Sequence, residues 1–375
     1  MKSKLRERIY QNVMKTPKVV RKGVASYVYS AAKKEFDSIE TPKLINLFIT
    51  DRCNLYCSHC FYAAHLNKPV NELDLKKYEK LFASMKNPIK TVVMTGGEPF
   101  LRADIIDIIK ILDKYKTEKV NIPTNATMPK VVYNKVREVL DTINIDVNIQ
   151  VSIDGPEKMH DEIRGMKGSY KRCIEAIKQL KELRHEYENF DITVSTTISR
   201  RNLGVIDELV KDIEKLGVFH GLQFVRSAAL QSFDIDKNIL SDFDPSDEIL
   251  TVEEMETLAK YINNQNKNVN PLLKKTISVV NEYFIRVSKE KKRFMNCTAG
   301  KVDCVIYTDG GVSVCEFTKP FANLKDFDYD FYKLWKSKKA DDRRKQTDCC
   351  SCTHQCNLMN SLRYDKKSIN KIFDS

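Results

Sequence analysis

Asp51-Arg52-Cys53-Asn54-Leu55-Tyr56-Cys57-Ser58-His59-Cys60-Phe61-Tyr62 is the stretch from which the fold and the chemistry of this chain can be predicted. It follows a strand-like run, Leu44 to Thr50, and places its three cysteines in a C-x3-C-x2-C spacing. Three thiolates on one short loop can converge on one metal site. A mononuclear zinc site would need a fourth protein ligand, whereas a cubane [4Fe–4S] cluster can take three thiolates and leave one iron open. A structural zinc loop is the alternative interpretation.

A second motif, Thr95-Gly96-Gly97-Glu98-Pro99, follows the next strand-like run, Thr91 to Met94. Its two glycines let the backbone approach a ligand closely, and Glu98 supplies a carboxylate beside them. A Gly-Gly pair alone would indicate only a turn. This motif, however, lies downstream of the cysteine loop and at the end of the next strand. In that position it indicates a ligand site much more specifically than a Gly-Gly pair alone.

Together the two motifs resemble the radical S-adenosylmethionine (radical SAM) superfamily. The resemblance implies that the open iron of the cluster chelates the amino and carboxylate groups of SAM. An electron from the cluster then cleaves SAM to methionine and a 5′-deoxyadenosyl radical. It also implies that the backbone of Gly96 and Gly97 and the carboxylate of Glu98 hold the SAM amino group.

Composition excludes several classes of protein. The 375 residues are enough for two or three domains, or for one large barrel with an extension. No apolar run is long enough to span a membrane, and the N-terminus has no signal-peptide core. Eleven clustered cysteines without a secretory signal indicate metal ligation in a reducing cytoplasm.

Charge is concentrated at the N-terminus. The whole chain carries +12, from 63 Lys and Arg against 51 Asp and Glu, and residues 1–34 contribute +9 of it, with ten basic residues against Glu7. The rest of the chain is close to neutral and shows no broad basic face for nucleic acid. Residues 1–43 read as a basic helical segment broken at Pro17. Such a segment either caps the barrel or contacts anionic lipid or an acidic partner as a peripheral helix.

From residue 44 to 227 strand-like and helical patterns alternate. The strand-like runs are 44–50, 90–95, 119–124, 147–153, 191–198 and 222–226, and the helical runs between them are 73–86, 102–115, 129–140, 168–187 and 203–216. Buried parallel strands with helical crossovers form an α/β barrel. Six of them match the partial (βα)6 TIM-like barrel of radical SAM enzymes, in which ligands lie at the C-terminal strand ends.

Further motifs fall at those ends. Asn125 follows the third strand, and Ser152-Ile153-Asp154-Gly155-Pro156 follows the fourth, ahead of His160-Asp161-Glu162-Ile163-Arg164-Gly165. The last two stretches resemble the signature of the SPASM/twitch branch of the superfamily. The resemblance implies that Ser152 and Arg164 contact SAM, Arg164 through the SAM carboxylate, which suits its planar fork. A surface ion pair is the alternative for Arg164, and a simple turn for Asp154.

Three assignments around these motifs follow from the resemblance alone. Asn125 would contact the ribose of SAM, Asp154 would belong to the cofactor site, and the backbone of Tyr62 would reach the adenine edge. His59 occupies the position where the family places an aromatic residue against the adenine.

The C-terminal region holds seven of the eleven cysteines. Tyr307-Thr308-Asp309-Gly310-Gly311 predicts a hairpin turn that returns Cys315 towards Cys297. The pattern resembles the SPASM/twitch extension, which binds auxiliary iron–sulfur clusters. One auxiliary [4Fe–4S] cluster is implied, with Cys297, Cys315, Cys352 and Cys356 as ligands and Cys304, Cys349 and Cys350 as alternates. The alternative is a second auxiliary cluster with an open or non-cysteine ligand. A structural zinc site would use the same thiolates, and the isolated Cys173 reads as a core residue.

Glu316 follows Cys315 directly. In the sulfatase-maturating relatives an acidic residue just after the matching cysteine acts as a general base, and Glu316 resembles it in position and charge. The alternative is a solvent-exposed acid at the end of a hairpin strand.

The sequence thus predicts four parts: a basic N-terminal segment (1–43), a radical SAM partial barrel (44–227), a linker with two helices at 251–265 and 271–290 (228–296), and a SPASM/twitch-like cluster domain (297–375). The predicted function is hydrogen-atom abstraction from a peptide or natural-product precursor by an oxidoreductase or transferase-type enzyme. An external electron donor such as flavodoxin or ferredoxin would reduce the cluster. The alternatives are the same chemistry on a small molecule, sugar or lipid precursor, and a non-catalytic iron–sulfur or zinc protein.

Overall fold

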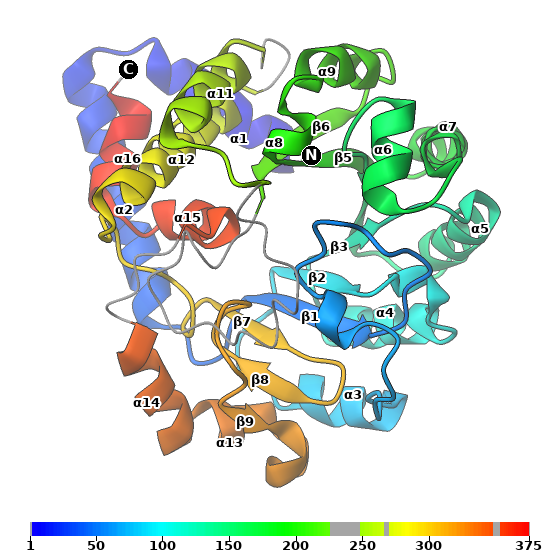
Figure 1. Ribbon diagram of the computed structural model, residues 1–375. Helices are drawn as coiled ribbons and strands as arrows, with labels where there is room; N and C mark the ends of the chain where they lie inside the picture. The colour runs from blue at the N-terminus through cyan, green and yellow to red at the C-terminus, as the bar shows by residue number, and fades with distance from the viewer. Residues whose placement is uncertain (1, 226–247, 266–269, 348–352, 375) are drawn as a thin grey trace.

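The computed structural model describes residues 2–225, 248–265, 270–347 and 353–374. Its centre is a nine-stranded sheet in the order β6-β5-β4-β3-β2-β1-β7-β8-β9 (Figure 1). The first six strands pair in parallel. They are β1 (Leu44–Thr50), β2 (Thr91–Gly96), β3 (Lys119–Thr124), β4 (Asp146–Ser152), β5 (Phe190–Ile198) and β6 (Phe219–Phe224). All six predicted strands are present, and the one that is clearly displaced is β6, which begins at Phe219 instead of residue 222.

Side chains alternate along these strands between two environments. In β1, Ile45, Leu47 and Ile49 are buried in the main hydrophobic core, while Asn46 lies on the inner face of the sheet and lines a cavity. The same alternation in β3 buries Val120 and Ile122 and leaves Asn121 facing the cavity. The outer face is therefore apolar and covered by helices, and the inner face is polar and accessible to a ligand.

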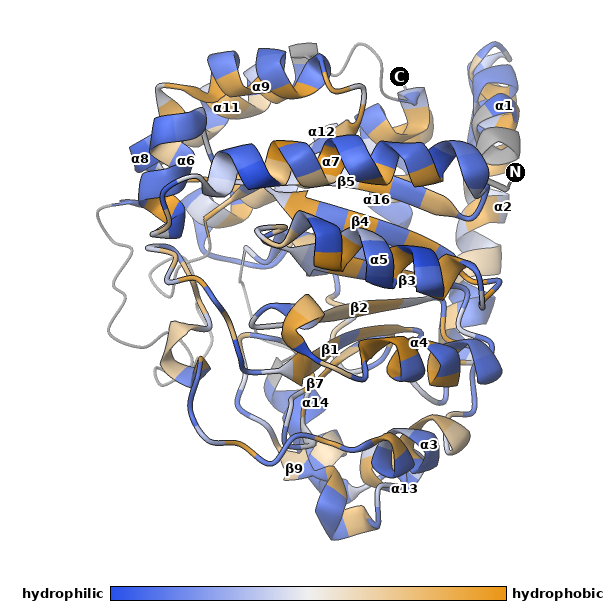
Figure 2. Cartoon of the chain, turned by 90° about the vertical axis from the view of Figure 1, so that its right-hand side faces the viewer, coloured by the Kyte–Doolittle hydropathy of each residue, from blue (hydrophilic) through white to orange (hydrophobic). Residues whose placement is uncertain are grey.

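The crossover helices cover the outer face, as Figures 1 and 2 show for α5 and α7 beside β3 to β5. They are α3 (Leu75–Ala83), α4 (Ile105–Lys114), α5 (Pro129–Leu140), α7 (Ser169–Glu186), α8 (Arg200–Leu203) and α9 (Ile206–Glu214). Of these, α3, α4, α5, α7 and α9 confirm the predicted helical runs, and the short α8 was not predicted. The sequence pattern did not reveal α6 (Glu157–Arg164), because its residues are mostly charged and only His160 and Ile163 are buried.

The predicted C-terminal hairpin is present as β7 (Asp303–Ile306) and β8 (Gly311–Ser313), followed by β9 (Ala322–Asn323). The sequence did not predict that β7 pairs in parallel with β1, with Leu44 opposite Asp303 and Leu47 opposite Ile306. The hairpin therefore continues the barrel sheet past β1. This pairing brings residues near 303 and 316 to the wall of the barrel.

The remaining helices lie on both sides of the C-terminal hairpin in Figure 1. The two predicted ones are α11 (Val252–Gln265) and α12 (Pro271–Glu290), and the sequence analysis missed α13 (Phe331–Trp335), α14 (Lys338–Thr347), α15 (Gln355–Leu362) and α16 (Lys366–Phe373). Most of the predicted linker 228–250 lies outside the described residues. The proposed division into four parts remains a prediction.

The N-terminal segment forms two helices, α1 (Lys2–Met14) and α2 (Lys18–Asp37), which meet at Pro17 as predicted. α1 packs against α12 and α2 against α16. Glu35 ties α2 to the barrel and to the C-terminus through ion pairs with Lys43 (3.0 Å), Lys90 (2.5 Å) and Arg363. Within the described residues, no helix combines the length and apolarity that crossing a bilayer requires.

Candidate functional site

A cavity of about 460 Å³ lies inside the barrel at the C-terminal ends of the parallel strands. The cysteine loop, the Gly96-Gly97-Glu98 motif and the ends of β3 and β4 all line it. On the other side it is closed by residues of the C-terminal extension, including Asp303, Glu316, Asn357 and Asn360. The motifs predicted from separate parts of the sequence thus share one cavity.

Cys53, Cys57 and Cys60 all line this cavity. The loop that carries them is fixed by the Asn67 side chain, which bonds the backbone N and O of Cys53 at 3.0 Å each, and by Ser58 N donating to Ile163 O at 2.9 Å. Burial raises the pKa of Cys53 to about 11 and that of Cys60 to about 12. Metal binding would therefore have to displace protons from both thiols.

No three His, Cys, Asp or Glu side chains among the described residues are gathered closely enough to hold a single metal ion. The thiols of Cys53, Cys57 and Cys60 are likewise too far apart to hold a single ion. The set of three cysteines facing a cavity nevertheless supplies the donors that a cluster with one open iron needs.

The Gly96-Gly97 turn requires glycine for reasons of space. Gly96 has φ 125°, and a Cβ there would lie 2.2 Å from Thr50 O. A Cβ on Gly97 would lie 2.1 Å from Arg52 O. The glycines thus let the end of β2 pack directly against the start of the cysteine loop, with Gly97 N donating to Thr50 O at 2.8 Å.

Glu98 lines the cavity, but its carboxylate is already used within the fold. One oxygen accepts from Phe100 N (3.1 Å) and Thr124 Oγ1 (2.8 Å), and the other accepts from Asn125 N (2.8 Å). Burial is the largest effect on this carboxylate and raises its pKa, although these bonds oppose the rise. The structure gives Glu98 a role that the sequence did not predict: it joins the ends of β2 and β3.

Asn125 and Ser152 both line the cavity, and their contacts with SAM stay predictions. The Asn125 side chain bridges to the cysteine loop, because its Nδ2 donates to Asn54 Oδ1 at 2.8 Å. Its Oδ1 accepts from Thr127 N and Thr127 Oγ1. Behind these residues Cys173 is fully buried, as predicted, with its thiol donating to Asn125 O at 3.1 Å.

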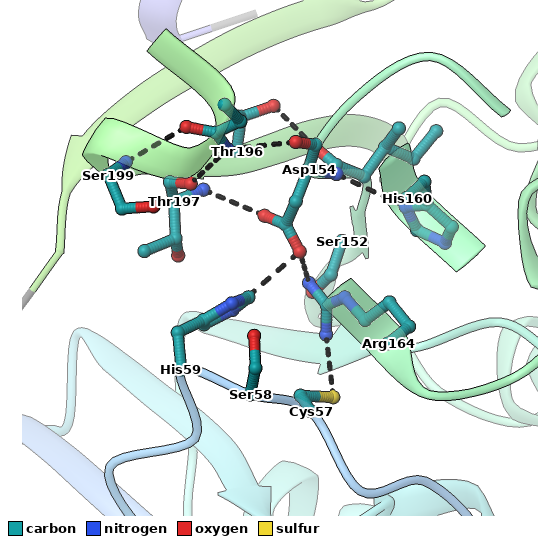
Figure 3. Close-up of polar contacts among 12 residues, drawn as sticks. Cys57, Ser58, His59, Ser152, Asp154, His160, Arg164, Thr196, Thr197 and Ser199 are labelled. Carbon is teal, nitrogen blue, oxygen red and sulfur yellow. Dashed lines mark hydrogen bonds and ion pairs between the residues drawn. The ribbon is translucent and has the colours of Figure 1, made fainter. Parts of the chain in front are cut away.

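Arg164 lies at the cavity wall with only 11% of its side chain exposed, which excludes the alternative of a surface ion pair. Figure 3 shows its guanidinium between two partners. Nη2 lies 2.5 Å from Asp154 Oδ2, and Nη1 donates to Cys57 Sγ at 3.7 Å. Arg164 Nε is buried and has no hydrogen-bond partner among the described residues.

Asp154 is completely buried and is absent from the cavity lining, so direct contact with a cofactor, as implied by the resemblance, does not fit this geometry. It lies behind Arg164, and Nε2 of His59 lies 3.6 Å from the same Oδ2 (Figure 3). Burial raises the pKa of Asp154, but Arg164 and His59 outweigh it and leave the pKa below its usual value. Burial also lowers the pKa of His59, which lines the cavity.

The Tyr62 side chain points away from the cavity. Its hydroxyl donates to Asp51 Oδ1 at 2.9 Å, and its ring packs among Phe48, His65 and Tyr307. Packing in this buried cluster is the reason why an aromatic residue follows the cysteine loop. The contact of the Tyr62 backbone with adenine stays a prediction.

The hairpin brings Cys315 and Cys297 to a common neighbour, as predicted. Asn357 Nδ2, on α15, lies 3.4 Å from Cys315 Sγ and 4.0 Å from Cys297 Sγ. Cys356 is exposed and lines the cavity from the same helix. Cys352, Cys349 and Cys350 lie outside the described residues. Cys304 is buried in the main hydrophobic core, whereas Cys315 belongs to a separate cluster with Val314 and Phe317.

Glu316 is 6% exposed, so the alternative of a solvent-exposed acid is wrong. It lines the cavity, and Oε1 accepts from Asn46 Nδ2 of β1 at 3.1 Å. Oε2 lies 3.0 Å from His354 Nε2, directly before α15. The β1–β7 pairing therefore places this carboxylate inside the barrel.

Asp303, His354 and Asn357 are among the polar residues at the site that the sequence did not reveal. Asp303 lines the cavity and accepts from Thr298 Oγ1 (2.9 Å) and Asn360 Nδ2 (3.3 Å), and burial raises its pKa to about 7. Its acidic side chain in an apolar strand, Asp303-Cys304-Val305-Ile306, was the available signal. His354 and Asn357 carried none, because the helix that presents them was not predicted.

Comparisons with known proteins agree with this geometry. The family model "Radical SAM superfamily" matches residues 47–209. An AdoMet-dependent heme synthase of Methanosarcina barkeri is 32% identical over 185 residues, covering 47% of this chain and 48% of that protein. The chain thus spans about half the length of the heme synthases that it matches.

Two other similarities extend over most of the chain. The antilisterial bacteriocin subtilosin biosynthesis protein AlbA of Bacillus subtilis is 23% identical, covering 96% of this chain and 77% of AlbA. The structure of Streptococcus suis SuiB bound to S-adenosylmethionine superimposes with a TM-score of 0.58 at 16% identity, covering 83% of this chain and 69% of SuiB. The matched model and the residues at the strand ends identify residues 47–209 as a radical SAM domain, and the fold shared with SuiB extends over most of the chain.

Proposed function

We propose that this chain is an enzyme that cleaves SAM reductively and abstracts a hydrogen atom from a peptide. One observation carries the proposal: three cysteines and the buried Arg164 face the same cavity inside a radical SAM barrel. When bound, a reduced [4Fe–4S] cluster would supply the electron for cleavage of SAM into methionine and a 5′-deoxyadenosyl radical. Cys53, Cys57 and Cys60 would hold that cluster.

The residues present fit SAM as well. Arg164 Nε is a buried donor without a partner among the described residues, next to a cavity that reaches the cysteine loop. A guanidinium edge of this kind suits a carboxylate group. Ser152 and Asn125 add neutral polar groups at neighbouring strand ends, and Gly96 and Gly97 line the same cavity. Tyr62 would contribute its backbone only, since its side chain is turned away.

The cavity lining favours a peptide over a tetrapyrrole. Seven side-chain amides line it: Asn46, Asn121, Asn125, Gln150, Gln223, Asn357 and Asn360. Such groups pair well with a peptide backbone. Arg164 is the only Lys or Arg among the described lining residues, while Asp303 and Glu316 would repel the carboxylates of a tetrapyrrole. SuiB, whose fold is similar, has been crystallised with its precursor peptide SuiA.

Glu316 is proposed as the base that takes a proton from the substrate. Its position on the cavity wall beside Asn46 and His354 supports that role. Cys297 and Cys315, brought together around Asn357, are proposed to ligate one auxiliary [4Fe–4S] cluster with Cys352 and Cys356. An external reductant such as flavodoxin or ferredoxin would supply electrons in the cytoplasm.

The second candidate is the same chemistry on a small molecule. It is favoured by the 32% identity to a heme synthase, which is confined to about half of this chain.

The exposed Val19 and Tyr27 on the basic helix α2 favour peripheral contact with an anionic membrane as an additional property.

The test is anaerobic reconstitution with iron and sulfide, followed by reduction in the presence of SAM. The wild-type protein should release 5′-deoxyadenosine, and the triple variant with Cys53, Cys57 and Cys60 changed to Ala should release none. Retained release by the triple variant would refute the assignment of the loop. Candidate precursor peptides and tetrapyrroles are then compared by their ability to stimulate turnover by the wild-type protein.

A further inference from the structure

Asp154 occupies an unusual position for a charged residue. It is 0% exposed and does not line the cavity, yet it lies one layer behind two residues that do, Arg164 and His59. A buried carboxylate is costly unless it is paired and hydrogen-bonded. Here Arg164 Nη2 lies 2.5 Å from Oδ2, and Thr197 N donates to Oδ1 at 2.9 Å.

The backbone of Asp154 is fixed as firmly as its side chain. Its N–H donates to His160 Nδ1 of α6 at 3.2 Å, and its carbonyl accepts from Asn202 Nδ2 of α8 at 2.8 Å. Burial lowers the pKa of His160 to about 4, so its ring is neutral and free to accept this bond. Asp154 therefore has little freedom to move when a ligand enters the cavity (Figure 3).

The same carboxylate oxygen faces two segments that are distant in the sequence. Arg164 ends α6, and His59 lies in the cysteine loop with Nε2 at 3.6 Å from Oδ2. Arg164 also reaches that loop directly, through Nη1 and Cys57 Sγ at 3.7 Å. Asp154, Arg164 and the loop are thus linked by one close ion pair, of 2.5 Å, and by two longer polar contacts, of 3.6 and 3.7 Å.

We propose that Asp154 is a positioning residue, which holds the guanidinium of Arg164 in place and, through His59, also the cysteine loop. One buried carboxylate would thereby fix the position of the SAM site relative to the cluster loop. This inference rests on the proposed SAM-binding role of Arg164. Nη2 of Arg164 pairs with Asp154, and Nη1 donates to Cys57. The Nε side of the guanidinium therefore remains available for a ligand carboxylate. Asp154 itself does not touch SAM.

The first test measures SAM affinity rather than activity. Asp154→Asn keeps the shape of the side chain and removes its charge, so Arg164 loses its ionic partner. The reconstituted variant should bind SAM about tenfold to a hundredfold more weakly by calorimetry, the range expected for a charged hydrogen bond. The electron paramagnetic resonance signal of the reduced cluster should remain, but its SAM-induced change should need correspondingly more SAM.

Asp161→Asn is the matched control. Asp161 lies on α6, as Arg164 does, and caps α7 through Gly168 N, Ser169 Oγ and Tyr170 N, without contacting Arg164. This variant should lower the melting temperature and leave the SAM dissociation constant unchanged. If both variants weaken SAM binding equally, the effect is structural and the positioning role is wrong.

The second test addresses the cysteine loop in the metal-free protein. His59→Phe keeps a planar ring and removes the contact with Asp154. Both His59→Phe and Asp154→Asn should speed alkylation of Cys57 by iodoacetamide, read by peptide mass spectrometry, and the double variant should react no faster than Asp154→Asn alone, because both changes break the same contact. Additive effects would show that Asp154 does not act through His59.

The outcomes separate this inference from the proposed function. If the wild-type protein neither binds nor cleaves SAM, the proposed function fails, whatever the alkylation rates show. If the wild-type protein binds SAM and Asp154→Asn binds it with the same dissociation constant, the proposed function stands and the positioning role of Asp154 is refuted.

Discussion

Nε2 of His354 lies 3.0 Å from Oε2 of Glu316, and both residues are buried, although 38 positions separate them. Glu316 is supplied by the hairpin that extends the barrel sheet, and His354 directly precedes α15. Asn46 of β1 binds the other carboxylate oxygen at 3.1 Å. A carboxylate oriented by two partners and facing a cavity is well placed to accept a proton from a substrate.

Glu316→Gln is the first predicted variant. It keeps the contact with Asn46 and removes the basicity, so we expect normal 5′-deoxyadenosine release but product formation lowered by about 10²-fold or more, the scale of general-base catalysis. Asp309→Asn, an exposed acid in the turn of the same hairpin, should behave like the wild type. Full product formation by Glu316→Gln would mean that the proton leaves by another route.

Arg164→Lys should weaken SAM binding. Lysine keeps the positive charge but has a single nitrogen, whereas the planar guanidinium can contact Asp154 and a ligand carboxylate through different nitrogens. The free energy of SAM binding should therefore weaken by roughly 1–3 kcal/mol. Calorimetry on the reconstituted protein measures it. Arg172→Lys, at an exposed position of α7, is the control and should bind SAM normally. Equal affinities in all three proteins would rule out Arg164 as a SAM ligand.

Metal content distinguishes an auxiliary cluster from a zinc site. Two cubanes predict about eight irons per chain after reconstitution, whereas a structural zinc in the extension predicts about four irons and one zinc. Changing Cys53, Cys57 and Cys60 together to Ala should remove about four irons and leave the signal of the auxiliary cluster visible. Loss of all iron from that variant would argue against a second cluster.

Asp303→Asn should change how stability depends on pH. In the folded protein burial raises the pKa of Asp303 to about 7, whereas an unfolded aspartate ionises near 3.9. Between these values the folded state binds the extra proton, so its stability falls as the pH rises, by up to about 1.4 kcal/mol per unit. Denaturant titrations between about pH 5 and pH 7 should show this decline in the wild type and a weaker one in Asp303→Asn. Parallel curves would show that Asp303 is ionised throughout.

Several features could be predicted from the sequence because they are local. The cysteine spacing, the Gly96-Gly97 turn and the strand and helix periodicities each depend on residues close together in the chain. The structure accordingly has the six parallel strands, the crossover helices around them and the hairpin that returns Cys315 towards Cys297. Each of these follows from backbone conformation and apolar spacing.

Other features were decided only by the tertiary structure. The pairing of β7 with β1 buries Glu316 beside Asn46, 270 positions away in the sequence, and brings Asp303 to the cavity. Asp154 reads as part of a turn or of a cofactor site in the sequence, and the fold places it behind Arg164 instead. The physical reason is the same in each case. The environment of a carboxylate is set by the charges and donors that other segments bring to it, and spacing along one segment carries no information about them.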